Sequence, residues 1–232
     1  MNAIITGASS GIGETIARRL AAEGHQVALM ARREEKVREI AAELEGAIAV
    51  PGDVGKVEDC EAAVRAAVEA FGGLHALVNG AGIWVEEPLH EATYEQIRAF
   101  VDTDVSGALQ ITRAALPELM KEGGRLVHIN GLQGLIRVRP PVLYATVESA
   151  VRGLCESLRW EAASHGVHVG LITLGSVANE EAPTPDPAVL HNDDKRERLS
   201  RDEVADAVLF MLSRPTGVNV DEMVLTPLEQ IF

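Results

Sequence analysis

Short apolar runs alternate with longer segments of helical periodicity along most of the chain. Runs rich in Val, Ile, Leu and Ala predict buried strands, and apolar residues spaced three and four positions apart predict helices. The predicted strands are Ala3–Thr6, Gln26–Ala31, Ala47–Pro51, Leu74–Asn79, Arg125–Asn130, His168–Thr173 and Glu222–Thr226. The predicted helices are Gly11–Ala22, Glu34–Glu45, Lys56–Phe71, Tyr94–Met120 with a candidate break near Asp102, Val142–Ser164 and Ser200–Ser213.

Strands separated by helices predict a parallel sheet, because each helix returns the chain to the edge at which the next strand begins. The pattern is that of an α/β protein with a Rossmann-type, doubly wound parallel sheet of about seven strands flanked by helices. No linker or change of composition divides the sequence, and a hydrophobic content of 47% is enough for one sizeable core. Residues 1–232 are therefore expected to form a single domain.

One long connection interrupts this regular alternation. Residues 179–199 contain three prolines and show no clear periodicity. The segment follows a predicted strand, at the edge of the sheet where such folds bind ligands. We interpret it as a lid-like cover over a pocket, with a disordered surface loop as the alternative.

The acidic balance of the chain narrows the classes of partner. A formal net charge of −14 repels phosphate backbones, so nucleic acid and anionic membranes are poor partners and a small-molecule substrate or ligand is expected. No apolar run approaches the roughly 20 residues of a membrane span, and the first strand follows Met1 too closely for a signal peptide, so we expect a cytoplasmic protein. Cys60, Cys155 and the seven histidines lack metal-ligand spacing, so no metal site is expected.

The candidate chemistry begins at a glycine-rich turn between the first strand and the first helix. Glycines allow positive φ and close approach of the backbone to a ligand, and the free amides of a helix N-terminus favour an anion. The turn therefore predicts a pyrophosphate site, and a tight turn without a ligand is the alternative. It reads Thr6-Gly7-Ala8-Ser9-Ser10-Gly11-Ile12-Gly13, of which Gly7, Ser9, Ser10, Gly11, Ile12 and Gly13 are the candidate cofactor-binding residues.

Over nearly its whole length the chain resembles the short-chain dehydrogenase/reductase family. The resemblance implies an oxidoreductase that acts on a small carbonyl or alcohol with a nicotinamide dinucleotide. It also implies a homodimer or homotetramer, because the helices predicted near 94–120 and 142–164 correspond to the family's main dimer surface. The matching pieces are the glycine-rich turn, Asp53-Val54, Asn79-Gly80-Ala81-Gly82 in place of the family's Asn-Asn-Ala-Gly, and the segment around Tyr144. The stretches Ala31–Arg33 and Asn219–Glu222 are similar to the NADP-dependent branch that includes clavulanate dehydrogenase and 3-hydroxy acid dehydrogenases.

The resemblance further assigns contacts to the cofactor. Asp53 and Val54 would lie at the adenine, and Asn79, Gly80 and Ala81 along the ribose. Tyr144, Gly175 and Val177 would lie near the nicotinamide.

The end of the second predicted strand decides which nucleotide is expected. An acidic side chain there would bind the ribose hydroxyls and repel a 2′-phosphate, which selects NAD. This chain has Ala31 there, followed by Arg32 and Arg33, whose guanidinium groups match phosphate geometry. NADP is therefore predicted in preference to NAD. The alternative is a solvated helix start in which both arginines pair with Glu34 and Glu35.

The positions that carry the chemistry in this family are altered here. By resemblance, Tyr144 would transfer a proton at the substrate oxygen. However, Glu148 stands where the family has a lysine, Gly131 where it has a serine, and Asp104 where it has an asparagine. Lysine favours tyrosinate, whereas a carboxylate four residues away on one helix face raises the pKa of a phenol above its ordinary value of about 10. Acid–base assistance is worth about 10²–10⁴-fold, so the usual reaction should be severely impaired.

Three functions remain open on the sequence alone. The first is an NADP-dependent oxidoreductase with weak or non-standard activity, and the second is a nucleotide-binding pseudoenzyme or partner subunit. The third is a non-redox enzyme in which Tyr144 acts with Glu148 and Asp104, two crowded carboxylates that would share a proton. Asn130, Ser149 and Ser176 are candidate substitutes for the missing serine, although Ser149 should face elsewhere on its helix.

Overall fold

The alternating strand and helix pattern folds into one parallel sheet with helices on both faces. The computed structural model describes residues 1–84, 87–132, 141–178 and 198–228. Within these ranges, seven strands lie in the order β3-β2-β1-β4-β5-β6-β7, and every neighbouring pair is parallel. The strands are β1 (Asn2–Thr6), β2 (Gln26–Ala31), β3 (Ala47–Pro51), β4 (Ala76–Asn79), β5 (Arg125–Gly131), β6 (His168–Leu174) and β7 (Glu222–Leu225).

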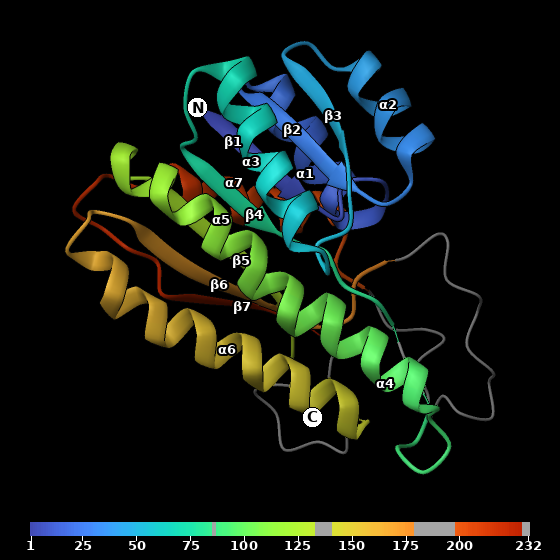
Figure 1. Ribbon diagram of the computed structural model, residues 1–232. Helices are drawn as coiled ribbons and strands as arrows, with labels where there is room; N and C mark the ends of the chain where they lie inside the picture. Colours follow the sequence, from blue (N-terminus) through green and yellow to red (C-terminus); the bar gives the residue numbers. More distant parts are fainter. Residues whose placement is uncertain (85–86, 133–140, 179–197, 229–232) are drawn as a thin grey trace.

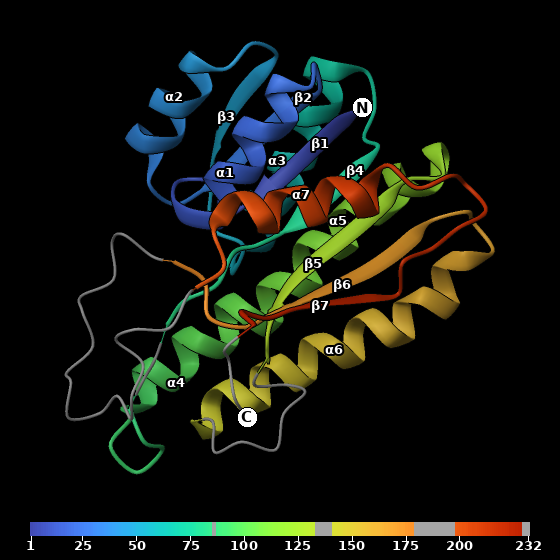
Figure 2. The ribbon, with the colours of Figure 1, turned by 180° about the vertical axis from the view of Figure 1, so that it is seen from behind.

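The strands are nearly continuous apolar runs because helices cover both faces of the sheet. Figures 1 and 2 show α3, α5 and α6 on one face, where they enclose Leu77 and Leu126, and α1, α2 and α7 on the other, around Ile5 and Val127. The helices are α1 (Gly11–Ala22), α2 (Glu34–Glu43), α3 (Val57–Phe71), α4 (Tyr94–Phe100), the π-helix η1 (Val101–Ser106), α5 (Gly107–Glu122), α6 (Val142–Ala163) and α7 (Arg201–Leu212).

The predicted fold class is confirmed, and each strand end lies within two residues of its prediction. The predicted lid falls mostly outside the described residues, since 179–197 are not among them. From the predicted 179–199 segment, Leu199 is described, and it forms an isolated parallel bridge with Val177.

The long helix predicted for Tyr94–Met120 is not broken near Asp102. Instead, α4 continues through η1 into α5 without leaving helical geometry. A π-helix closes its hydrogen bonds over five residues rather than four, so it shifts which side chains face the sheet while the helix continues. Such segments occur frequently at functional sites, and this one contains Asp104.

The order of the strands creates a crevice between β1 and β4. The chain builds β1, β2 and β3 outward in one direction and then crosses back to begin β4 on the other side of β1. The connections after β1 and β4 therefore leave the sheet in opposite directions, which opens a space beyond the carboxyl ends of these strands. Ligands of doubly wound sheets bind at this kind of switch point.

Candidate active site

Thr6, the last residue of β1, joins the two loops that border the crevice. Its hydroxyl donates to Oδ1 of Asn79 at 2.8 Å and accepts from the backbone N–H groups of Gly80 and Ala81, both at 3.1 Å. Thr6 and Asn79 are buried, so these bonds are shielded from competing water. The loop after β4 is thereby fixed to the end of β1.

The glycines of the turn bring bare backbone to the crevice. Gly7 adopts a φ of +71°, and a Cβ there would lie 2.6 Å from the carbonyl oxygen of Gly80. A Cβ on Gly13 would lie 2.4 Å from the carbonyl oxygen of Gly7. Both contacts are too short for any side chain, so the turn, the first turn of α1 and the loop after β4 pack backbone against backbone.

A cavity of about 390 Å³ occupies the crevice. The glycine-rich turn, the ends of β2 and β3, and the loop after β4 all contribute to it. Its lining residues are Gly7, Ser9, Ser10, Ile12, Gly13, Met30, Ala31, Arg32, Arg33, Gly52, Asp53, Val54, Gly80, Ala81, Gly82 and Thr103.

The structure thus brings together most of the predicted cofactor-binding residues, but not all of them. Gly11, Asn79 and Tyr144 lie outside the lining of this cavity, as do Gly175 and Val177, which follow β6. The sequence reasoning assigned no role to Met30, Gly52 or Thr103. Gly52 directly follows the predicted strand Ala47–Pro51, and Met30 is the penultimate residue of Gln26–Ala31, so a rule that includes the residues around each strand end would have found both.

The two arginines after β2 behave differently. Arg33 donates from Nε to the hydroxyl of Ser9 at 3.1 Å and also contacts the hydroxyl of Ser10, which places a cation against the glycine-rich turn. Within the described residues, Arg32 forms no hydrogen bond or ion pair, and Glu34 pairs with Arg38. Arg32 therefore does not pair with Glu34 or Glu35, as the alternative of a solvated helix start would require.

Tyr144, on α6, is held beyond the Gly82 end of the cavity. Its side chain is buried, and its hydroxyl donates to the carbonyl oxygen of Ile83 at 3.2 Å. The ring lies 4.5 Å from that of Trp84 and meets Phe100 edge-on at 5.1 Å. Trp84, Phe100 and Ile83 are neighbours that the sequence reasoning missed, because a backbone contact and a ring stack leave no spacing motif.

Asp104 lies beside the same loop. Its Oδ2 accepts from the backbone N–H of Ile83 at 3.2 Å, so Ile83 binds Asp104 through one backbone group and Tyr144 through the other. Burial raises the pKa of Asp104 to about 7; the bond from Ile83 opposes this rise, and the charge of Glu148 adds to it. The charge of Glu148 thus acts on Asp104, as the prediction that the two carboxyl groups lie near each other requires.

Glu148 accepts from the backbone N–H of Gly131 at 2.7 Å through Oε2. Burial raises its pKa to about 7, against the effect of this hydrogen bond. Neither Glu148 nor Asp104 forms an ion pair within the described part of the chain. The site therefore contains two carboxyl groups that can be protonated near neutral pH.

Two of the three candidate substitutes for the serine, Asn130 and Ser149, bond to backbone oxygens. The buried Asn130 donates from Nδ2 to the backbone oxygen of Glu148 at 3.2 Å. Ser149 is exposed and donates to the carbonyl oxygen of Ala145 at 2.5 Å, as expected from its position on the helix. Gly131 offers only its backbone.

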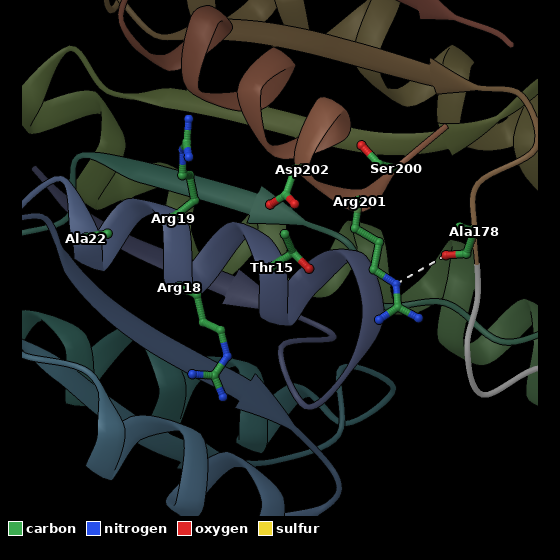
Figure 3. A pocket seen from close by; sticks show the side chains of 8 residues that line it. All are labelled: Thr15, Arg18, Arg19, Ala22, Ala178, Ser200, Arg201 and Asp202. Carbon is green, nitrogen blue, oxygen red and sulfur yellow. Dashed lines mark hydrogen bonds between the residues drawn. The ribbon is translucent and has the colours of Figure 1, made fainter. Parts of the chain in front are cut away.

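A second hollow, of about 530 Å³, lies between α1 and the start of α7 (Figure 3). Arg18 pairs with Glu14 and Glu43, and Arg19 pairs with Asp206. The capping box at the start of α7 pairs the backbone N–H groups of Ser200 and Glu203 with each other's side chains. Arg201 donates to the carbonyl oxygen of Ala178. Because the arginines that line the hollow already have partners, they give it no feature of an anion-binding site.

These observations define the class of protein. A doubly wound parallel sheet, with a glycine-rich turn and a cavity at its switch point, is the architecture of Rossmann-type α/β proteins. The family model of the short chain dehydrogenases matches residues 1–184. The chain belongs to the short-chain dehydrogenase family.

Relatives of known sequence and structure agree with this assignment. An uncharacterised oxidoreductase of Staphylococcus aureus (strain MRSA252) is 32% identical over 228 residues, which cover 97% of this chain and 96% of the relative. The crystal structure of serine dehydrogenase from Escherichia coli is similar over 100% of both chains, with 27% identity and a TM-score of 0.87. A short chain dehydrogenase from Burkholderia cenocepacia J2315, solved in complex with NADP, has 30% identity and a TM-score of 0.86 over 97% of this chain and 96% of that one.

No helix among the described residues combines the length and hydrophobicity that a membrane crossing requires.

We expect the raised pKa of Glu148 to make the protein less stable as the pH rises. A carboxyl group whose pKa is higher in the folded state contributes stability that is full below its ordinary pKa of 4.5 and is lost by about pH 7. Glu148→Gln abolishes this ionisation but still offers an oxygen to Gly131. The urea midpoint of the variant should therefore rise relative to wild type between these pH values.

Glu161→Gln is the matched control, because Glu161 is an exposed glutamate on the same helix. This variant should follow the wild-type pH profile. Parallel profiles for wild type and Glu148→Gln would show that the Glu148 carboxyl is not perturbed by folding.

Proposed function

We propose that this protein binds NADP(H) at the switch-point cavity and is an oxidoreductase with weak activity on small carbonyls or alcohols. The observation that carries the proposal is the cavity itself, which is lined by the bare backbone of Gly7 and Gly13 at one side and by Arg32 and Arg33 at another. When bound there, the nicotinamide would donate or accept a hydride.

The residues present fit a dinucleotide. A Cβ at Gly7 or Gly13 would collide with backbone, so the turn keeps its amides close to whatever lies in the cavity. The N-cap Ser10 of α1 makes no side-chain cap bond, which leaves the first amides of the helix available to a phosphate. Asp53 and Val54 also line the cavity and would contact the adenine.

NADP is favoured over NAD by the residues that follow β2. Ala31 supplies no carboxylate for the ribose hydroxyls, and Arg32 lines the cavity without an intramolecular partner among the described residues. A 2′-phosphate would provide that partner. The similar protein from Burkholderia cenocepacia J2315 was solved with NADP, which supports the same choice.

Arg32→Ala should abolish most of the preference for NADPH over NADH. The loss of one charged hydrogen bond is expected to weaken NADPH binding by about 1.5–3 kcal/mol and to leave NADH binding nearly unchanged. Isothermal titration calorimetry with both nucleotides measures this difference. Arg38→Ala is the control, because Arg38 is exposed on α2, pairs with Glu34 and does not line the cavity. Equal NADPH affinities for wild type and Arg32→Ala would refute the assignment.

Weak activity on carbonyls is proposed because of the groups around Tyr144. Gly131 has no hydroxyl to orient a substrate oxygen, and Glu148 presents a carboxyl group where the family has an ammonium. The hydroxyl of Tyr144 itself is bonded to Ile83. A substrate would therefore bind near the nicotinamide, but its oxygen would lack the usual proton donor.

Restoring the family residues should restore carbonyl reduction. The triple variant Gly131→Ser, Glu148→Lys, Asp104→Asn should reduce reactive aldehydes or diketones about 10²–10⁴-fold faster than wild type with NADPH. The gain should exceed the sum of the single changes, because members of one catalytic unit are not additive. Adding Tyr144→Phe should remove the gain. Wild-type turnover of about 1–10³ s⁻¹ that Tyr144→Phe abolishes would contradict the proposal.

Membership of the NADP-dependent branch is supported by one similar structure and by a stretch near the C-terminus. Serine is itself a 3-hydroxy acid, and the similar structure from Escherichia coli is a serine dehydrogenase. In the stretch Asn219–Glu222, Asn219 donates to the carbonyl oxygen of Val169 at 2.9 Å, and Glu222 pairs with Arg152. On this basis we propose that the protein belongs to the NADP-dependent branch that includes the 3-hydroxy acid dehydrogenases. Because its site is altered, its substrate would differ from theirs.

A second candidate function is non-redox acid–base chemistry. It is favoured by the pKa values of about 7 at both Asp104 and Glu148, which suit a group that must both donate and accept a proton near neutrality. In that case Tyr144 and the two carboxyl groups would carry out an elimination or isomerisation. A nucleotide-binding pseudoenzyme or partner subunit would bind NADPH and show neither reaction.

We also propose a homodimer or homotetramer that associates through α5 and α6. Leu109 on α5 is 48% exposed, and Val142 and Trp160 on α6 are 53% and 86% exposed. Trp160→Ser should weaken this association, and light scattering at micromolar concentration would detect the smaller species. Tyr94→Ser is the control, because Tyr94 is equally exposed, at 86%, on α4. A monomeric wild type would contradict the proposal.

A further inference from the structure

We propose that the substrate of this site carries a basic nitrogen, as an imine or the corresponding amine, and that Asp104 and Glu148 provide its counter-charge and its proton. The inference deepens the proposed function, since it rests on NADP(H) binding in the neighbouring cavity. It replaces the carbonyl group of the usual substrate by a C=N bond.

The first observation is that two partly buried carboxyl groups have no cationic partner among the residues that the structure describes. Asp104 and Glu148 each receive one backbone N–H, from Ile83 and Gly131, and form no ion pair within the described residues. Carboxylates removed from water are normally paired with a cation, because burial otherwise disfavours the charge. A positively charged nitrogen on the ligand would supply the missing partner.

The nearest cation along α6 is already committed. Arg152, one helical turn after Glu148, donates from Nη1 to Glu222 at 2.9 Å and lies 3.5 Å from Glu156. Its second terminal nitrogen also contacts Glu222. Glu222 in turn accepts from the hydroxyl of Thr173 at 2.8 Å. Because this network holds Arg152 toward β7, it does not neutralise Glu148.

The second observation is the aromatic group beside the carboxyls. Trp84 is 64% exposed, yet its ring lies 4.5 Å from that of Tyr144 at an interplanar angle of 50°. Phe100 meets the ring of Tyr144 edge-on, with the ring centroids 5.1 Å apart. Aromatic faces together with carboxylates are the combination that binds organic cations, whereas an anionic substrate would be repelled. The site should therefore favour cationic over anionic substrates.

The chemistry balances without any further reagent. The carboxylic acid of Glu148 or Asp104 gives its proton to the imine nitrogen and becomes the carboxylate that pairs with the resulting iminium. NADPH, when bound in the neighbouring cavity, would supply the hydride that adds to the carbon, and the C=N π electrons would become the lone pair of the nitrogen. The products would be the amine and NADP⁺, and a proton from bulk solvent would restore the carboxylic acid. An iminium needs no hydroxyl at position 131 to stabilise a developing oxyanion.

The test begins with binding, which does not depend on turnover. In a Trp160→Phe background, Trp84 is the remaining tryptophan of the chain, so its fluorescence reports on ligands beside Tyr144. With NADP⁺ present, methylpyrrolidine, a cation at neutral pH, should bind more tightly than the neutral cyclopentanol. Glu148→Gln and Asp104→Asn should each weaken amine binding at least about tenfold, as expected for loss of a charged hydrogen bond. Glu161→Gln should leave it unchanged.

The second measurement is of activity, and it compares a cyclic imine with a cyclic ketone. With NADPH, kcat/KM for the cyclic imine methylpyrroline should exceed that for cyclopentanone at least about tenfold, and Glu148→Gln should reduce this ratio. Equal binding of amine and alcohol, or amine binding that survives both substitutions, would overturn the inference while leaving NADP(H) binding intact. Failure of NADPH itself to bind would overturn both the proposed function and the inference.

Discussion

The site depends on the backbone contact between the turn after β1 and the loop after β4. Gly7 and Gly80 approach so closely that no side chain fits between them, and the hydroxyl of Thr6 fixes the two loops together. The same loop continues through Gly82 to Ile83, whose backbone binds both Asp104 and Tyr144. One short segment therefore connects the switch-point cavity to the groups around Tyr144, and a shift of its fixed end would move both.

The fold could be predicted from the sequence because the sheet is covered on both faces. Strands such as Gln26–Ala31 and Ala47–Pro51 read as uninterrupted apolar runs, and their predicted bounds coincide with the observed ones. The π-helix at Val101–Ser106 could not be predicted in this way. Apolar periodicity averages over several turns, so one turn that contains an additional residue changes the helix face without leaving a visible break in the pattern.

The candidate site was predictable only where side-chain identity carries the information. The glycine-rich turn, the arginines after β2 and the altered positions at 104, 131 and 148 are all visible in the sequence. Their partners are mostly backbone groups: the N–H of Gly131 for Glu148, and both groups of Ile83 for Asp104 and Tyr144. Backbone donors and acceptors are present at almost every position, so no residue pattern can indicate which of them a side chain will meet.

The carboxyl groups of Asp104 and Glu148 raise the question of whether these positions have lost a function or serve another one. Removing a carboxylate from water disfavours its charged form, so Asp104 and Glu148 reduce the stability of the folded protein at neutral pH. A site under no constraint could relieve this penalty with apolar or exposed side chains. Instead, each carboxyl group retains a specific backbone donor and a pKa of about 7, next to Tyr144 and at the end of the cavity. Carboxyl groups with perturbed pKa values are common at functional sites, and this is the physical reason for proposing a chemical role for these two.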